Sequence, residues 1–205
     1  MMKKFIEKQY FKGLSKKVDG DIVQEIQQRY KIILQENQSW IVDKPTELNI
    51  IFTSMVLSTF QTLKDRSIKD WESIIRYSLV EHSQEKQRFF MKLFLRLDPT
   101  PFKRIVNISK WKQVNHYGDQ HFQYDILTDT DRNYHFHIKK CFFFDFFRSH
   151  DALEMMPLFC SLDNIWGDLL KNPKYGVRFE RPQLLSKGDP HCSFQFENLR
   201  HKSLH

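Results

Sequence analysis

Only three cysteines occur in the 205 residues, and no run of apolar residues approaches the roughly 20 that a helix needs to span a bilayer. An odd and small number of cysteines excludes a disulfide framework and fits a reducing compartment. The first residues are basic, but they lack the apolar segment and small-residue cleavage site of a secretory signal. We therefore expect a cytoplasmic protein that has no membrane partner.

Dense charge of one sign is also missing, although the formal net charge is +7. The lysines and arginines are spread along the chain, and neither a basic helix nor a zinc-finger spacing is present. This distribution argues against a nucleic-acid partner. A dispersed positive charge is compatible with an anionic small-molecule substrate.

Hydrophobic residues are plentiful, at 40% of the chain with 19 phenylalanines, so a sizeable core can form. Apolar residues follow a helical period through the first hundred residues and an alternating period afterwards. This switch near Pro101 predicts an α+β fold. We expect a helical region at 1–100, followed by an α+β core at 101–205 whose antiparallel sheet spans about 104–197, in a single compact domain.

Several elements can be placed within this outline. A helix is expected at about 67–97, broken near 81–84, and a hairpin is expected around the turn "TDTDRN". The Phe-rich segment "CFFFDFF" reads as core. The apolar stripe from Ile50 to Leu63 reads as core or as the contact face of a homodimer, and both interpretations stay open.

All three cysteines fall in the half of the chain that is expected to build the sheet. Cys141 ends a strand, Cys160 lies within a helix, and Cys192 begins the last strand on the face of Phe194 and Phe196. Asp163 follows Cys160 by three residues, so both project from one side of a helix. A free cysteine is usually a buried small hydrophobe, but a buried carboxylate needs a partner or a role.

These residues form an ordered pattern: a Cys after a strand, Cys160-x-x-Asp163, Phe179-x-Arg181, and Gly188-Asp189-x-x-Cys192-x-Phe194. This pattern, over roughly residues 100–197, resembles the C-terminal part of the L-2-amino-thiazoline-4-carboxylic acid hydrolase family. The resemblance implies hydrolysis of a carbon–nitrogen bond in a cyclic amidine, with ring opening to an N-carbamoyl amino acid. It makes the protein a hydrolase acting on carbon–nitrogen bonds other than peptide bonds.

The resemblance also suggests roles for individual residues. Cys141, Cys160, Asp163 and Cys192 are the candidate catalytic residues, and the pattern does not identify which thiol attacks. Arg181 is expected to bind a substrate carboxylate. His137 has the same parity as Cys141, so this pair could meet, and His137 is a second candidate for substrate binding.

An alternative interpretation rests on the last strands, which are also similar to the end of 4-vinyl-reductase-type domains. Such a domain would be a small-ligand-binding or sensing module with a cysteine-rich zinc site. The zinc-binding relatives use Glu-x-x-Cys before the final Cys, whereas Arg181 and Leu184 stand at these positions here. We therefore expect no cofactor. If zinc is bound, its ligands would be Cys141, Cys160, Asp163 and Cys192.

Overall fold

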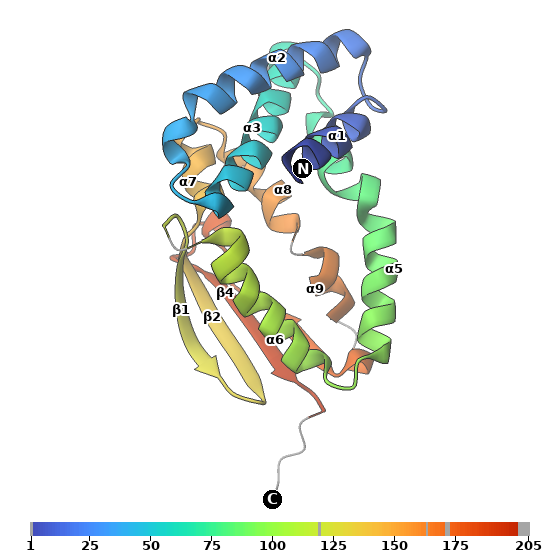
Figure 1. Cartoon of the computed structure of the whole chain (residues 1–205), viewed down its shortest axis with the longest axis vertical. Helices are drawn as coiled ribbons and strands as arrows, with labels where there is room; N and C mark the ends of the chain where they lie inside the picture. Colours follow the sequence, from blue (N-terminus) through green and yellow to red (C-terminus); the bar gives the residue numbers. More distant parts are fainter. Residues whose placement is uncertain (1, 119, 163, 171–172, 201–205) are drawn as a thin grey trace, which may run out of the picture.

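The computed structural model describes residues 2–118, 120–162, 164–170 and 173–200. It is an α+β fold, in which helices of the N-terminal half pack with an antiparallel sheet of the C-terminal half, as the change of period predicts (Figure 1). The helical half comprises α1 (Met2–Leu14), α2 (Gly20–Glu36), a 3-10 turn (Gln38–Trp40), α3 (Lys44–Asp65), α4 (Trp71–Arg76), a π-turn (Tyr77–Glu81) and α5 (His82–Leu97). Among the residues described, no helix is both long enough and apolar enough to cross a membrane.

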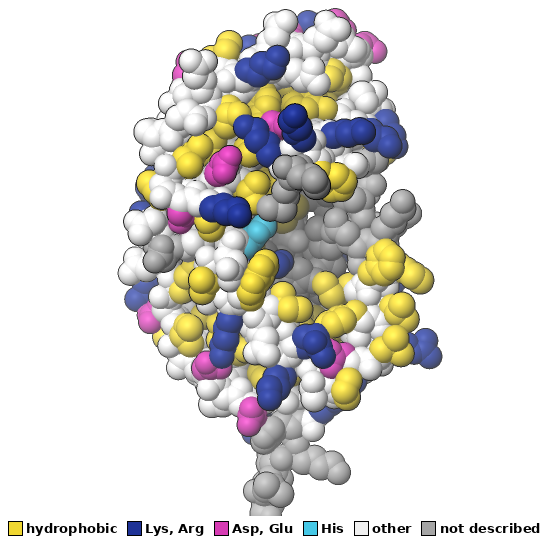
Figure 2. Space-filling view, viewed as in Figure 1, with side chains coloured by type: hydrophobic (Ala, Val, Ile, Leu, Met, Phe, Trp, Pro, Cys, Tyr) yellow, Lys and Arg dark blue, Asp and Glu magenta, His cyan; other side chains and the backbone are white. Residues whose placement is uncertain are grey.

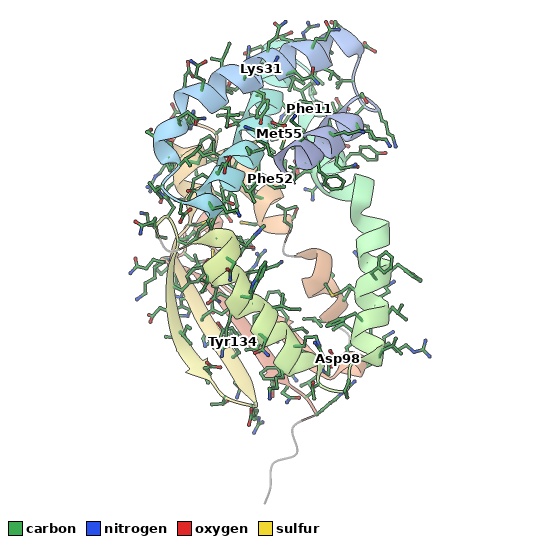
Figure 3. The ribbon with its side chains drawn as sticks, viewed as in Figure 1. Phe11, Lys31, Phe52, Met55, Asp98 and Tyr134 are labelled. Carbon is green, nitrogen blue, oxygen red and sulfur yellow. The ribbon has the colours of Figure 1, made fainter. Side chains whose placement is uncertain are left out.

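The helix α3 is the central element of the helical half. Its start is a reciprocal capping box: Thr46 N–H donates to the Asp43 carboxylate at 2.8 Å, and Asp43 N–H donates to Thr46 Oγ1 at 3.0 Å. Such caps satisfy backbone donors that have no partner within the helix. The apolar stripe of α3 is buried in this chain's own core, where Met55 is fully buried (Figure 3).

The helix expected at about 67–97 is interrupted. The π-turn at Tyr77–Glu81 separates α4 from α5 and lies slightly before the expected break. A π-turn inserts one extra residue into the helical hydrogen-bond pattern, so the direction of the side chains changes across it. This change lets α5 extend away from the other N-terminal helices and beside the C-terminal half (Figure 1).

The C-terminal half contains the sheet and several short helices. Its elements are α6 (Pro101–Lys112), a π-turn (Gln113–Tyr117), β1 (Gln123–Asp129), β2 (Asn133–Lys140), α7 (Phe142–Ser149), a 3-10 turn (Leu153–Met155), α8 (Met156–Ser161), α9 (Asn164–Leu170), a 3-10 turn (Pro173–Tyr175), β3 (Val177–Glu180), a 3-10 turn (Leu185–Lys187) and β4 (Cys192–Asn198). The strand order is β1-β2-β4-β3, and every pairing is antiparallel.

The expectation that the sheet begins near residue 104 is wrong, because α6 and its π-turn occupy 101–117. Pro101 stands in the first turn of α6, where a missing N–H is harmless. Phe102 and Val106 are one helical turn apart and both are buried, so this segment packs as a helix. The sheet therefore starts at Gln123, with the expected hairpin.

The junction between α5 and α6 is held by Asp98 at the end of α5 (Figure 3). Its carboxylate accepts the backbone N–H of Thr100 at 2.8 Å and pairs with Arg104 of α6. These contacts hold the pKa of Asp98 below its usual range, with the Thr100 N–H as the main cause. They also set the relative positions of the two helices that border the cavity described below.

Two apolar clusters build the core. The first joins α1–α4 to α7 and α8, and it contains the fully buried Phe142, Phe146 and Phe147 of the Phe-rich segment. The second joins the sheet to α5, α6 and α9, and it contains Phe136, Phe194 and Phe196. The partly buried Tyr124 and Ile138 contact both clusters. A cavity lies where the clusters meet.

Candidate active site

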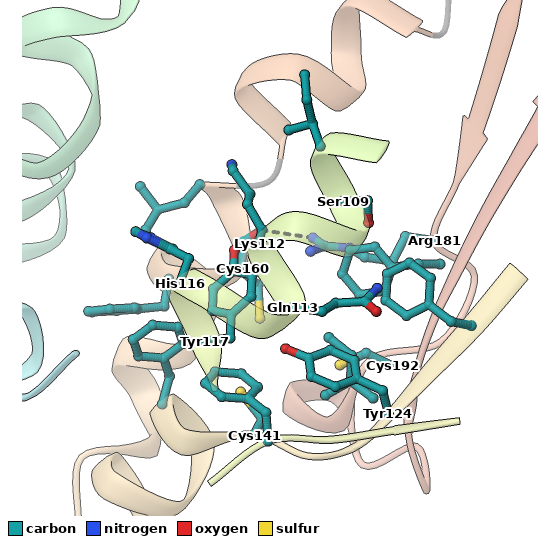
Figure 4. Close-up of a pocket in the computed structure, with 18 of the residues that line it drawn as sticks. Ser109, Lys112, Gln113, His116, Tyr117, Tyr124, Cys141, Cys160, Arg181 and Cys192 are labelled. Carbon is teal, nitrogen blue, oxygen red and sulfur yellow. Dashed lines mark hydrogen bonds between the residues drawn. The ribbon is translucent and has the colours of Figure 1, made fainter. Parts of the chain in front are cut away.

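The cavity has a volume of about 490 Å³. Its walls come from the inner face of the sheet, from α6 and the π-turn that follows it, from α8, and from α3 and α5. Figure 4 shows side chains from the sheet, from α6 and its π-turn and from α8 converging on it. A space of this size can hold a small-molecule ligand.

The structure brings all three thiols to this cavity. Cys141 is the residue before α7, Cys160 is near the end of α8, and Cys192 is the first residue of β4 (Figure 4). The sheet pairs Cys192 with Ile138, so both point inward with Phe136 and Phe194. The expected inward face of the last strand is therefore confirmed. Asp163 lies outside the residues that the structure describes.

Each thiol has a different environment. Burial strongly raises the pKa of Cys141, and the backbone N–H of Phe144 only partly opposes this effect, so Cys141 stays protonated at neutral pH. Cys160 Sγ lies 3.4 Å from the hydroxyl oxygen of Ser186. Cys192 Sγ accepts the backbone N–H of Leu185 at 3.3 Å, a contact that stabilises negative charge on sulfur.

Two cations line the cavity, Arg181 and Lys112, and no Asp or Glu is found among the described residues of its wall. Arg181 Nη2 donates to the carbonyl oxygen of Cys160 at 2.8 Å, and the guanidinium lies 5.5 Å from the ring centre of Phe194. Arg181 therefore lines the same cavity as the thiols. Both charged side chains in the described part of the wall are cations, a composition that suits an anion.

Several polar residues of the cavity were not anticipated. Lys112, Gln113, His116 and Tyr117 all come from the end of α6 and its π-turn, which was expected to be sheet. Gln113 Nε2 donates to the hydroxyl oxygen of Tyr134 at 3.0 Å, which holds the amide in place. Burial, together with the charge of Lys112, lowers the pKa of His116, so its imidazole is neutral at pH 7.

His137 does not line the cavity, so its expected position beside Cys141 is wrong. It pairs with Ser193 across β2 and β4, and residues at this parity point to the outer face of the sheet. Its ring stacks on His191 with the ring centres 3.6 Å apart, and His135 lies 5.0 Å away. The strand ends at Lys140, so strand parity does not extend to Cys141.

This outer histidine cluster predicts a loss of stability in mild acid. Burial is the main cause that lowers the pKa of His135 and His137, and the neighbouring imidazoles add to it, while Asp125 opposes it at His137 and Lys139 reinforces it. In the unfolded chain these histidines take up protons at about pH 6.5, whereas in the folded chain they take up protons only at a lower pH. The free energy of unfolding should therefore fall as the pH drops below about 6.5.

Thermal unfolding at pH 8, 7, 6 and 5 would measure this effect. The variants His135→Gln and His137→Gln should each have a flatter profile than the wild type. A matched control is His150→Gln, since His150 directly follows α7 and stacks on Phe146, away from the cluster. Equal pH profiles in the wild type and the cluster variants would contradict the assignment.

A metal site is not evident in the described part of the chain. There, no group of three or more His, Cys, Asp or Glu side chains has an arrangement that could hold a metal ion. The three thiols thus share a cavity without forming a ligand set by themselves. The proposed fourth ligand, Asp163, is not described, so the full zinc set of Cys141, Cys160, Asp163 and Cys192 remains an expectation.

Comparison with known proteins assigns the chain to a family. No curated protein and no solved structure matches the chain significantly. The family model described as L-2-amino-thiazoline-4-carboxylic acid hydrolase matches residues 48–196, a range that includes most of α3, nearly all of the sheet and all three thiols. No comparison supports the alternative 4-vinyl-reductase-type module. The chain belongs to the L-2-amino-thiazoline-4-carboxylic acid hydrolase family.

Proposed function

We propose that this protein hydrolyses a cyclic amidine that carries a carboxylate, with Cys192 as the nucleophile. The observation that carries the proposal is the position of Cys141, Cys160 and Cys192 on one cavity whose described charged residues are both cations. A thiolate attacks an electrophilic amidine carbon, and a cation binds a carboxylate. The family name is that of a hydrolase whose named substrate has both groups.

Cys192 is preferred as the nucleophile for two physical reasons. It has a backbone N–H donor on its sulfur, and it stands on a strand that is held on both sides by β2 and β3. Cys141 is a poor nucleophile, because burial keeps its thiol protonated. A thiol with so high a pKa is also a poor acid, so the neutral His116 is the better candidate for proton transfer.

A two-step reaction accounts for the atoms. The Cys192 sulfur bonds to the amidine carbon, the ring sulfur–carbon bond breaks, and the departing sulfur takes a proton. Water then adds to the same carbon, the bond to Cys192 breaks, and the Cys192 sulfur takes back a proton. The net reaction adds one water and leaves the enzyme unchanged.

The bond that breaks determines the product. In an aminothiazoline ring, the N-carbamoyl product requires cleavage of the carbon–sulfur bond, whereas cleavage of the ring carbon–nitrogen bond gives an S-carbamoyl product. The expected carbon–nitrogen cleavage and the expected N-carbamoyl product thus exclude each other in this ring. We propose the N-carbamoyl product, because a thiolate is a better leaving group than an amine at neutral pH.

The test is incubation of the purified protein with L-2-amino-thiazoline-4-carboxylate. Mass spectrometry should show the gain of one water, and a thiol reagent should detect one new thiol per turnover. A matched ring in which nitrogen replaces sulfur can open only by carbon–nitrogen cleavage, so it separates the two bond types. Binding of these compounds, seen as a thermal shift without turnover of any, would overturn the proposed reaction.

A further inference from the structure

The cavity is larger than the ring that the family name implies. An aminothiazoline carboxylate has about nine non-hydrogen atoms and would occupy roughly a third of the 490 Å³ available. The thiols and Arg181 define the end where such a ring would react. Other walls of the cavity come from α3, α5 and α6, whose apolar lining residues are Phe52, Met91, Phe94, Leu95, Ile105 and Ile108.

The wall that α3 supplies contains a buried polar group without a partner in the described structure. Asn49 of α3 lines the cavity with only 3% of its surface exposed, and its side-chain Nδ2 has no hydrogen-bond partner in the described structure. Phe52, three residues further along α3, lines the same cavity, so both side chains project from one side of the helix. A buried amide donor without an acceptor is costly, and a ligand with an acceptor would remove this cost.

We propose that the natural substrate carries an extended apolar substituent with a hydrogen-bond acceptor, which fills the space between α3, α5 and α6. The reacting ring remains at the thiols, so this inference rests on the proposed function for that end only. The lining residues that α3 and α5 supply in the described structure are uncharged: Asn49, Phe52, Met91, Phe94 and Leu95. A cationic substituent would lose its hydration there without gaining a counter-ion from the described wall.

The surface beside the cavity supports an apolar substrate. Hydrophobic side chains are exposed on α5 and α6, as Figure 2 shows over these helices. They are Phe89, Phe90, Leu93 and Leu97 on α5, and Ile108 and Trp111 on α6. Ile108 is 44% exposed and also lines the cavity, so the apolar wall continues to the outside. An apolar substituent could enter along this wall.

Two series of alkylated aminothiazoline carboxylates test the inference, one substituted on the exocyclic nitrogen and one on ring carbon 5. Calorimetry gives the affinity, and the water-gain assay gives the turnover. In at least one series the affinity should rise about fourfold per methylene until the apolar space is full, because each buried methylene contributes a similar free energy. Affinity that is independent of chain length in both series would overturn the inference.

A filled cavity provides the matched control. Ile105→Trp adds bulk at the apolar wall that α6 supplies and should abolish the dependence on chain length. Ile126→Trp adds the same bulk at a strand position that is half exposed and does not line the cavity, and it should keep the dependence. Equal chain-length profiles for these two variants would place the substituent elsewhere and contradict the inference.

Asn49→Leu tests the acceptor. A ligand whose alkyl substituent contains an internal amide carbonyl should bind the wild type about tenfold more tightly than it binds Asn49→Leu. A ligand with a plain alkyl substituent should bind the two proteins with similar affinity. If Asn49 had a purely structural role, Asn49→Leu would bind both ligands more weakly by the same factor. That result would contradict the proposed acceptor on the substrate. These are binding measurements, so they remain informative if no turnover occurs. Turnover without any effect of chain length would keep the proposed function and reject the inference.

Discussion

Cys192→Ser is expected to lower kcat for aminothiazoline carboxylate by about a thousandfold or more. An alkoxide does not form at neutral pH without a strong base, and a neutral hydroxyl is a far weaker nucleophile than a thiolate. Serine is close to cysteine in size, and Leu185 N–H can donate to its oxygen as it does to Cys192 Sγ. The fold should therefore survive, with a small change in the thermal midpoint.

The other two cysteines are the matched controls. Cys160→Ser should retain most of the activity, since the proposed nucleophile is Cys192 and a serine can keep the contact with the Ser186 hydroxyl. Cys141→Ser should be less stable, because Cys141 is partly buried and packs against the apolar core. Alkylation followed by peptide mapping should label Cys192 first, and substrate should protect it. Activity lost in Cys160→Ser and kept in Cys192→Ser would assign the nucleophile to α8.

The position of Cys192 was predictable, because alternation along a strand is a strict local rule. Cys192, Phe194 and Phe196 share a parity, and two large apolar side chains on that face show which way it points. The same reasoning applied to β2 separates Tyr134, Phe136 and Ile138 from the histidines. The alternation along the whole strand places His137 on the outer face, which the parity of His137 and Cys141 alone does not reveal.

The α6 side of the site was not predictable by the same means. Lys112, Gln113 and His116 enter the cavity because a π-turn follows α6, and the single inserted residue of a π-turn leaves little trace in an apolar pattern. Asn49 did leave a signal, as a polar residue within the wide apolar stripe of α3. The role of Asn49 depends on which residues of other elements line the same cavity, and only the tertiary structure shows these residues.

The charged end of the site leads to a prediction for Arg181. Arg181→Gln should raise KM for the carboxylate substrate by about 10- to 100-fold, because a charge-assisted hydrogen bond to a buried group contributes about 1.5–3 kcal/mol. The change in kcat should be much smaller, since the carboxylate is bound in both the ground state and the transition state. Arg181→Lys should be intermediate, because lysine keeps the charge but loses the planar fork.

Arg181 also donates to the carbonyl oxygen of Cys160, so a structural effect must be separated from substrate binding. The substrate provides this separation, because its carboxylate can be replaced by a neutral carboxamide. The wild type should bind the carboxamide far more weakly than the carboxylate, and Arg181→Gln should bind the two about equally. The second cation gives a parallel variant, Lys112→Gln, which should show a smaller preference change if Arg181 is the main partner. If the carboxamide penalty in Arg181→Gln equals that in the wild type, Arg181 acts by positioning α8 and not by binding the substrate.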